Sequence, residues 1–257
     1  MNGRLVHAVV AAGLADPRLL AKWSRGGQDL VARGIDPAAI DLAALRKFAG
    51  LTTSIRHNGL RRDFPETFRL LSLARLEIDL FADYAMHLAE ESQRLAATPA
   101  ERADDLIAFL ERWIDPHDRA HRLVLGLARH EAALLKMSGP MDFTPEPPAS
   151  RLPTIRGKLL LAPYEQDPRD IAAAEDGLLG AAARHDEVLL AYWRQHAEAT
   201  LRIATLDAFT YELLLRTDGS RTVAELAVAL TGTEPDGQFL AGLGAVTQLG
   251  LIAWCAT

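Results

Sequence analysis

Two strand-like segments followed at once by three helix-like segments, all within residues 187–255, constrain the fold of this chain more than any other feature. Residues 187–194 (EVLLAYWR) and 199–206 (ATLRIATL) are short and rich in aliphatic side chains, as strands are. The second segment alternates between two faces. We expect the face with Leu201 and Ile203 to pack into the core. The opposite face carries three residues: Thr200, Arg202 and Ala204.

Three short helices are expected after these strands. The first covers residues 207–217. Thr222 and Glu225 have the spacing of a capping box, in which each side chain satisfies the other residue's backbone N–H, and they begin the second helix. The third helix covers about residues 236–249 and ends at Gly250, where a left-handed C-cap forms most easily. Strands followed by three short helices joined by tight turns indicate a small winged helix.

The charge pattern of this region argues against DNA, the usual partner of a winged helix. Arg221 is the last Lys or Arg in the chain, so the third helix has no basic side chain to neutralise phosphates. The whole chain has a net charge of −6, which is unfavourable for binding nucleic acid or an anionic membrane. A neutral, apolar helix near a strand suits a different ligand, an extended peptide that adds to the strand's edge.

The segment DAFTYELLLRTDGSRTVAELAVAL, followed by FLAGLGAVTQLGLI, resembles the PqqD-like peptide-recognition domain of peptide-modifying systems. The Asp-Gly turn, the RTVAEL helix start and a last helix ending in glycine carry the resemblance. It implies a domain that holds the leader of a ribosomally made precursor peptide in a cleft between a strand and the third helix. The residues that we expect to bind this peptide are Thr200, Arg202, Ala204, Phe239, Leu243, Val246 and Thr247.

The N-terminal half has helical patterns throughout. Asp16-Pro17, Asp36-Pro37 and Asp115-Pro116 each place a capping residue before a proline that suits the first helical position. Thr98-Pro99-Ala100-Glu101 combines this arrangement with a capping box. Residues 74–95 have apolar side chains at helical spacing and predict a long amphipathic helix. We therefore expect a helical bundle over residues 1–138.

A proline-rich segment separates the two halves. Five of the chain's 13 prolines lie within residues 138–153, which predicts a stiff, extended linker over residues 139–153. After it, the apolar run in residues 154–163 predicts a first strand of the C-terminal sheet, and the alanine-rich residues 170–184 predict a helical insertion. The peptide-recognition domain is thus expected over residues 154–257.

The cysteine count and the hydropathy pattern limit the covalent cross-links, metal sites and membrane segments that the chain can form. Cys255 is the single cysteine, so neither a disulfide framework nor a multi-cysteine metal site is expected. No apolar run approaches the roughly 20 residues needed to cross a bilayer. We interpret the apolar residues 5–15 as a first helix rather than a signal peptide, and we expect a cytoplasmic protein.

Histidines are the main candidates for chemistry. His117 and His121 are four residues apart on one helix face, with His130 more than two turns further on, and such spacing can hold a metal. No third ligand has matching spacing, so an exposed polar face is the simpler interpretation. His57 has only Asp63 nearby as an orienting carboxylate for general-base chemistry. We expect no catalytic and no metal-binding residues on this chain.

A basic cluster surrounds His57 in an otherwise acidic protein. Its arginines are Arg56, Arg61, Arg62 and Arg69. A solvated basic face is one interpretation; an interface with an acidic partner is the other, because guanidinium groups suit bidentate contacts with carboxylates. Phe64-Pro65 is expected to end one helix and begin the next.

The run FAGLTTSIRHNGLRRDFPETFRLL, followed by LEIDLFADYA, resembles the N-terminal helical domain of partner proteins of multinuclear non-heme iron oxidative enzymes. Those pairs modify cysteines of precursor peptides, as in methanobactin-type and thiaglutamate-type pathways, and the iron belongs to the other subunit. The resemblance implies a heterodimer and no cofactor on this chain. The expected interface residues are Arg56, His57, Asn58, Arg61, Arg62, Phe64 and Pro65.

These observations predict a mainly α protein with a smaller α+β part, in which an N-terminal helical bundle precedes a winged-helix, PqqD-like domain. The expected function is that of a non-catalytic partner that binds an iron-dependent oxidative enzyme and recruits the leader of a precursor peptide for cysteine modification. One alternative is a stand-alone winged-helix adaptor or regulator that binds another protein. Another is an enzyme that uses the His117/His121 face with a bound metal.

Overall fold

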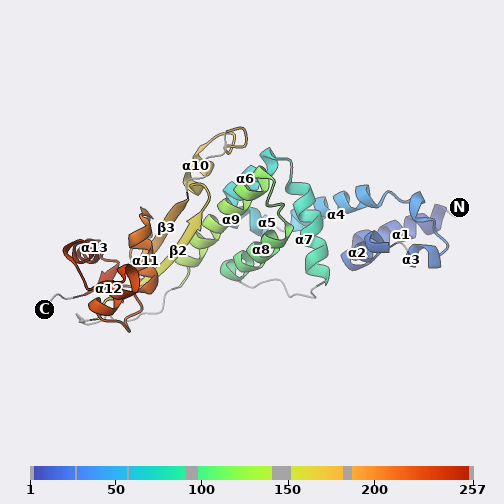
Figure 1. Ribbon diagram of the computed structural model, residues 1–257. Coiled ribbons are helices and arrows are strands. Elements are labelled where there is room, and N and C mark those ends of the chain that lie inside the picture. Colours follow the sequence, from blue (N-terminus) through green and yellow to red (C-terminus); the bar gives the residue numbers. More distant parts are fainter. Residues whose placement is uncertain are drawn as a thin grey trace. The chain divides into compact units, whose positions relative to one another are not determined.

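The computed structural model describes residues 3–26, 28–56, 58–90, 98–140, 152–181 and 187–254. The chain forms two compact units: unit 1 comprises residues 1–131 and 174–180, and unit 2 comprises residues 132–173 and 181–257. Figure 1 shows the elements of both units and confirms a mainly helical chain with a small number of strands.

Unit 1 is built from helices in the described residues. They are α1 (Gly3–Ala15), α2 (Pro17–Gly26), α3 (Gln28–Ala32), the 3-10 helix η1 (Pro37–Ala39), α4 (Leu42–Arg56), α5 (Asn58–Asp63), α6 (Pro65–Leu73), α7 (Glu77–Glu90), α8 (Pro99–Trp113) and the first part of α9 (Arg119–Ser138).

Two packed regions hold unit 1 together. The first helices enclose the fully buried ring of Trp23. Further along the chain, the rings of Phe68 and Phe81 stack with their centroids 5.2 Å apart. α4 packs closely on α7 at Gly50, where an added Cβ would lie 2.7 Å from the carbonyl oxygen of Ile78. The absence of a side chain at this position allows the two backbones to approach.

Two expected helix starts in unit 1 are wrong. The helix predicted over residues 74–95 begins only at Glu77, because Arg75 adopts a left-handed conformation (φ 61°) that interrupts it; residues 91–97 lie outside the described part. Asp115-Pro116 does not begin a helix. The Asp115 carboxylate accepts a hydrogen bond from the His117 N–H two residues on, which forms a turn, and α9 begins at Arg119.

Unit 2 contains a three-stranded antiparallel sheet and three helices that follow it. The strands lie in the order β2 (Lys158–Tyr164), β3 (Val188–Arg194) and β4 (Arg202–Leu206). The chain then forms α11 (Ala208–Arg216), α12 (Val223–Thr231) and α13 (Gly237–Gln248). A short helix, α10 (Pro168–Ala173), lies between β2 and β3 in the sequence. The three helices predicted after the strands are confirmed.

The helix termini of unit 2 follow the capping signals of the sequence. The expected capping box is present, with the Glu225 N–H donating to Thr222 Oγ1 and the Thr222 N–H donating to the Glu225 carboxylate. Asp207 and Asp236 cap α11 and α13. Gly250 has φ 75°, the left-handed conformation expected after the last helix.

The strand predicted over residues 154–163 is two strands. β1 (Thr154–Ile155) pairs with β5 (Ile252–Ala253), whereas β2 pairs with β3. Gly157 separates β1 from β2 with φ 74°, at a point where an added Cβ would lie 2.3 Å from the carbonyl oxygen of Arg194. The expectation of one continuous strand failed because the chain turns at this glycine.

The division between the units differs from the expected domain boundaries. The last turns of α9 belong to unit 2, where Ala133 and Met137 pack on Tyr192 of the sheet and the Arg194 guanidinium donates to the carbonyl oxygen of Met137. Residues 174–180 belong to unit 1, where Arg69 donates to the carbonyl oxygen of Ala174. Among its described residues, the predicted insertion 170–184 is helical only where it overlaps α10, and residues 182–184 of it lie outside the described part. Most of the predicted linker, residues 141–151, also lies outside it.

Candidate functional site

β4 lies at one edge of the three-stranded sheet. It pairs with β3 on one side, from Leu189 opposite Leu206 to Trp193 opposite Arg202. Within the described residues no strand pairs with its other side. An edge strand presents unpaired backbone N–H and C=O groups, which can pair with another extended chain. This edge is the first component of the candidate site.

Both faces of β4 are partly covered. Leu201 and Ile203 pack with the cluster around Tyr192, as expected for the core face. The opposite face is not free: Ala204 and Leu206 pack with the cluster formed by the three helices. Arg202 and Thr200 are exposed, and Thr200 precedes the strand. A bound peptide would therefore contact β4 along its edge and at its beginning.

A polar pocket of about 300 Å³ lies at the beginning of β4, around the turn that connects it to β3. Its lining residues are Trp193, Gln195, His196, Glu198, Ala199, Thr200 and Arg202. The Gln195 side chain is held by donation to the carbonyl oxygen of Gly250. The pocket includes two of the residues expected to bind peptide, Thr200 and Arg202. It is the second component of the candidate site.

The sequence reasoning missed the other five lining residues, of which Gln195, His196 and Glu198 are polar and lie in the connection between β3 and β4. A signal for them is present in the sequence. The polar run QHAE lies between two strand-like segments, and the connection between antiparallel strands places its residues at one end of the sheet.

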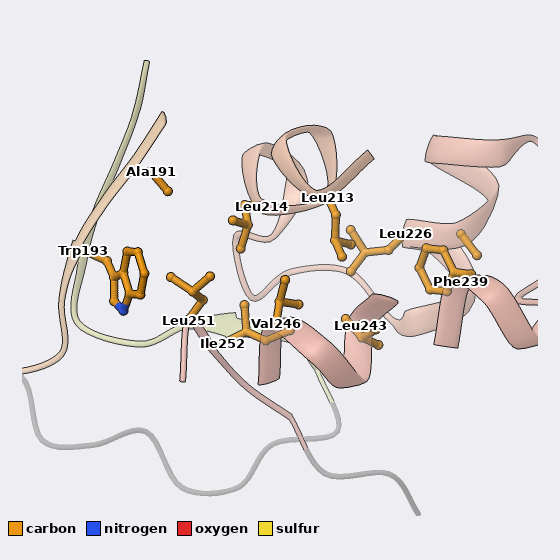
Figure 2. Packing of buried hydrophobic residues seen from close by; sticks show 11 residues of the cluster. Ala191, Trp193, Leu213, Leu214, Leu226, Phe239, Leu243, Val246, Leu251 and Ile252 are labelled. Atoms are coloured by element: carbon orange, nitrogen blue, oxygen red, sulfur yellow. The ribbon is translucent and has the colours of Figure 1, made fainter. Parts of the chain in front are cut away.

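The expectation for α13 needs correction. Phe239, Leu243 and Val246 are buried, with exposed fractions of 2%, 0% and 2%. Figure 2 shows them among the other buried side chains of unit 2, with Trp193 at one end of the view and Phe239 at the other. Thr247 is half-buried, and its hydroxyl donates to the carbonyl oxygen of Leu243. Helical spacing does not distinguish a groove-lining face from a core face, and here these three side chains belong to the core.

The segment expected to dock a partner enzyme has both buried and exposed members. His57 and the side chain of Arg56 lie outside the described part. Phe64 is fully buried and precedes α6, whereas Asn58 and Pro65 are exposed. Phe64 therefore stabilises the core of unit 1 and presents no contact surface.

The basic cluster is largely paired within unit 1. The Arg61 Nε donates to Glu77 Oε1 at 2.7 Å, and its guanidinium lies 5.7 Å from the centre of the Phe81 ring. Arg69 pairs with Glu66 at 2.7 Å. Arg62 is the exposed member: 79% of its side chain is accessible, and its nearest carboxylate contact is Asp63 at 3.7 Å. Among the described members of the segment expected to dock a partner, Asn58, Arg62 and Pro65 are exposed.

The three histidines considered for metal binding lie in different local environments. His121 Nδ1 accepts the Asp115 N–H at 2.9 Å, and its ring stacks on Trp113 with the centroids 4.8 Å apart. His117 is exposed and His130 is buried. Within the described residues, no three His, Cys, Asp or Glu side chains lie together so as to hold a metal ion.

Ionisable groups with perturbed pKa values lie in both units. Burial raises the pKa of Tyr192 in β3, whose hydroxyl lies 2.9 Å from that of Tyr164 in β2. The backbone N–H of Thr210 lowers the pKa of Asp207 at the start of α11. In unit 1, burial raises the pKa of Glu131. These groups support the fold, and none of them lines the pocket at the beginning of β4.

None of the described helices is both long and apolar enough to span a bilayer. Comparison with protein-family models gives no match for this chain, and comparison with curated proteins gives none either.

Proposed function

We propose that this chain is a non-catalytic partner protein that recruits the leader of a ribosomally made precursor peptide to an iron-dependent oxidative enzyme. In this proposal the leader binds as an added strand on β4 of unit 2. The observation that carries it is the position of β4 at the edge of the sheet, with one side unpaired in the described residues. Backbone hydrogen bonds would supply affinity, and nearby side chains would supply sequence choice.

The order of elements in unit 2 supports a peptide-binding domain of the winged-helix, PqqD-like kind. Three antiparallel strands precede three short helices, and the edge strand comes directly before the first helix. α13 has neither Lys nor Arg, and Asp236 caps its N-terminus. Such a helix is poorly suited to DNA, because phosphate neutralisation supplies much of DNA affinity.

Unit 1 is the proposed docking module for the enzyme, which would be a multinuclear non-heme iron protein. Within the described part of the basic segment, the exposed residues expected to dock are Asn58, Arg62 and Pro65. Because the Arg62 side chain is largely accessible, it can form a bidentate contact with a carboxylate of a partner. In this proposal the iron and the oxygen chemistry belong to the enzyme.

Strand addition can be tested with peptides whose backbone donors are removed one at a time. A short peptide selected on the purified chain from a displayed random library serves as the probe. We expect N-methylation at alternate residues of the paired segment to weaken binding about tenfold, roughly 1.4 kcal/mol per step, because every second residue points its N–H toward β4. Fluorescence titration measures the dissociation constants.

The residues between these positions are the matched control, because their N–H groups point away from β4. Their N-methylation should change the affinity little. A bound peptide whose affinity is insensitive to N-methylation, or lacks the alternation, would show that it does not add to β4 as a strand.

A co-purification distinguishes the proposed function from that of an adaptor. Retention of a regulatory protein and not of an iron enzyme would favour the adaptor function.

A further inference from the structure

The guanidinium of Arg202 is unpaired at the candidate site. Within the part of the chain that the structure describes, it has no ion pair and no hydrogen bond, and the residue is exposed. Other arginines of unit 2 differ: Arg169, Arg216 and Arg221 each lie against a carboxylate of a nearby residue in the sequence. The fold therefore leaves one positive charge available at the beginning of the edge strand.

The register of the sheet determines which residue of an added strand would lie opposite Arg202. Arg202 is the first residue of β4 and lies opposite Trp193 of β3. A strand added to the other side of β4 would place one residue directly opposite Arg202, with its side chain on the same face and the two Cβ atoms about 4.5–5.5 Å apart. Opposite charges at such a pair are favourable, and like charges are unfavourable.

Other side chains surround the pocket beside Arg202. Trp193 lines it and is itself almost fully buried in the core of unit 2. Thr200 and His196 also line the pocket. Glu198 lines it as well and brings a negative charge, but it belongs to the turn, four positions before Arg202, whereas Arg202 belongs to the strand itself.

We propose that the pocket at the beginning of β4 selects peptides with an aspartate or glutamate at one position, and that this side chain pairs with Arg202. A carboxylate matches the planar fork of the guanidinium and supplies the acceptor that Arg202 lacks. The inference rests on the proposed strand addition, and it names the class of leader that unit 2 would choose.

A charge exchange tests this pairing. Random peptides are displayed and selected in parallel on the full-length chain and on its Arg202→Glu variant. We expect binders of the original chain to share an acidic residue at a fixed distance from the N-methyl-sensitive positions. Binders of Arg202→Glu should carry Lys or Arg at the same place. For one acidic binder, Arg202→Gln should raise the dissociation constant about fivefold, and replacing the peptide's acid by its amide should have the same effect.

Glu198→Gln is the matched control, because it changes a charge in the same pocket without touching the strand. It should leave the acidic preference in place and should not weaken binding. If peptides still show the alternating N-methyl sensitivity but no acidic preference, or bind Arg202→Glu equally well, the pairing is wrong and strand addition stands. If the alternation itself is missing, the proposed function fails instead. Circular dichroism of each variant confirms that it is folded.

Discussion

The carboxylate of Glu131 caps a helix to which it does not belong. It extends from α9 and accepts the backbone N–H groups of Glu66 and Thr67, both at 2.9 Å, in the first turn of α6. Phe64, which precedes α6, has no side-chain capping bond. Glu131 is 6% exposed, and this burial raises its pKa, because water no longer stabilises the charged form. Glu131 therefore satisfies two backbone donors of α6, while its burial disfavours the charged form of its carboxylate.

The raised pKa makes a contribution to stability that depends on pH. Between the ordinary pKa of a glutamate and the raised value, folded chains bind more protons at this site than unfolded chains. The contribution of Glu131 to the free energy of unfolding therefore falls as the pH rises through this interval. Glu131→Gln should lack this fall. Urea unfolding followed by circular dichroism at several pH values measures the difference between the two proteins.

Glu225 provides a control, because its contribution to stability depends on pH in the opposite direction. Its pKa is lowered, chiefly by the backbone N–H of Thr222, so the stability that it contributes is present at higher pH and is lost as the pH falls through its lowered pKa. Glu225→Gln should remove a dependence that runs opposite to that of Glu131. A stability difference between Glu131→Gln and the original chain that stays constant with pH would contradict the assigned cause.

At the scale of elements, the close contact of α4 with α7 depends on Gly50. An added Cβ at this position would lie 2.8 Å from the backbone nitrogen of Ala82, and backbone atoms cannot rotate away. Gly50→Ala should therefore lower the free energy of unfolding by about 1–3 kcal/mol, despite the better helix propensity of alanine. Thermal and urea unfolding measure this change.

Gly126 is the matched control in the same unit. It lies within α9, and an added Cβ would meet no atom within 4 Å. Gly126→Ala should raise the free energy of unfolding by up to about 1 kcal/mol, because alanine loses less backbone entropy in a helix. Equal effects of the two substitutions would show that helix propensity, not the contact with α7, decides the outcome at Gly50.

The elements that were predictable from sequence are those defined by local signals. The capping box at Thr222 and the left-handed Gly250 are local backbone chemistry, and the structure contains both. The pairing of β1 with β5 joins residues about a hundred positions apart, which no local pattern encodes. Periodicity places Phe239 and Leu243 on one face of α13 but does not say whether that face meets the core or a ligand.

The candidate site, too, could be predicted from the sequence only in part. Arg202 was identified from strand alternation, and it does lie exposed at the edge strand. Its lack of a partner follows from where the other charges are placed in three dimensions. Conversely, Arg61 belongs to a basic cluster in the sequence, but its guanidinium is paired with Glu77, the first residue of α7. Composition identifies charged residues, whereas the fold decides which charges remain available.

At the scale of the whole molecule, the proposal assigns separate tasks to two units of one chain. Unit 2 would hold a peptide on β4, and unit 1 would bind the enzyme through the surface that contains Arg62. Covalent connection of two binding modules raises the effective concentration of peptide near the enzyme without new contacts. If the proposal holds, modification of the peptide should depend on this chain, while the enzyme supplies the catalytic groups.

The most direct test is a reconstitution of this chain with a candidate multinuclear non-heme iron enzyme and a candidate cysteine-bearing precursor peptide. Mass spectrometry follows the change in peptide mass with enzyme alone, with this chain alone, and with both. The proposal predicts modification with both proteins, little with the enzyme alone and none with this chain alone, and a slower reaction with Arg62→Glu. Equal modification by the enzyme without this chain, or any modification by this chain alone, would contradict it.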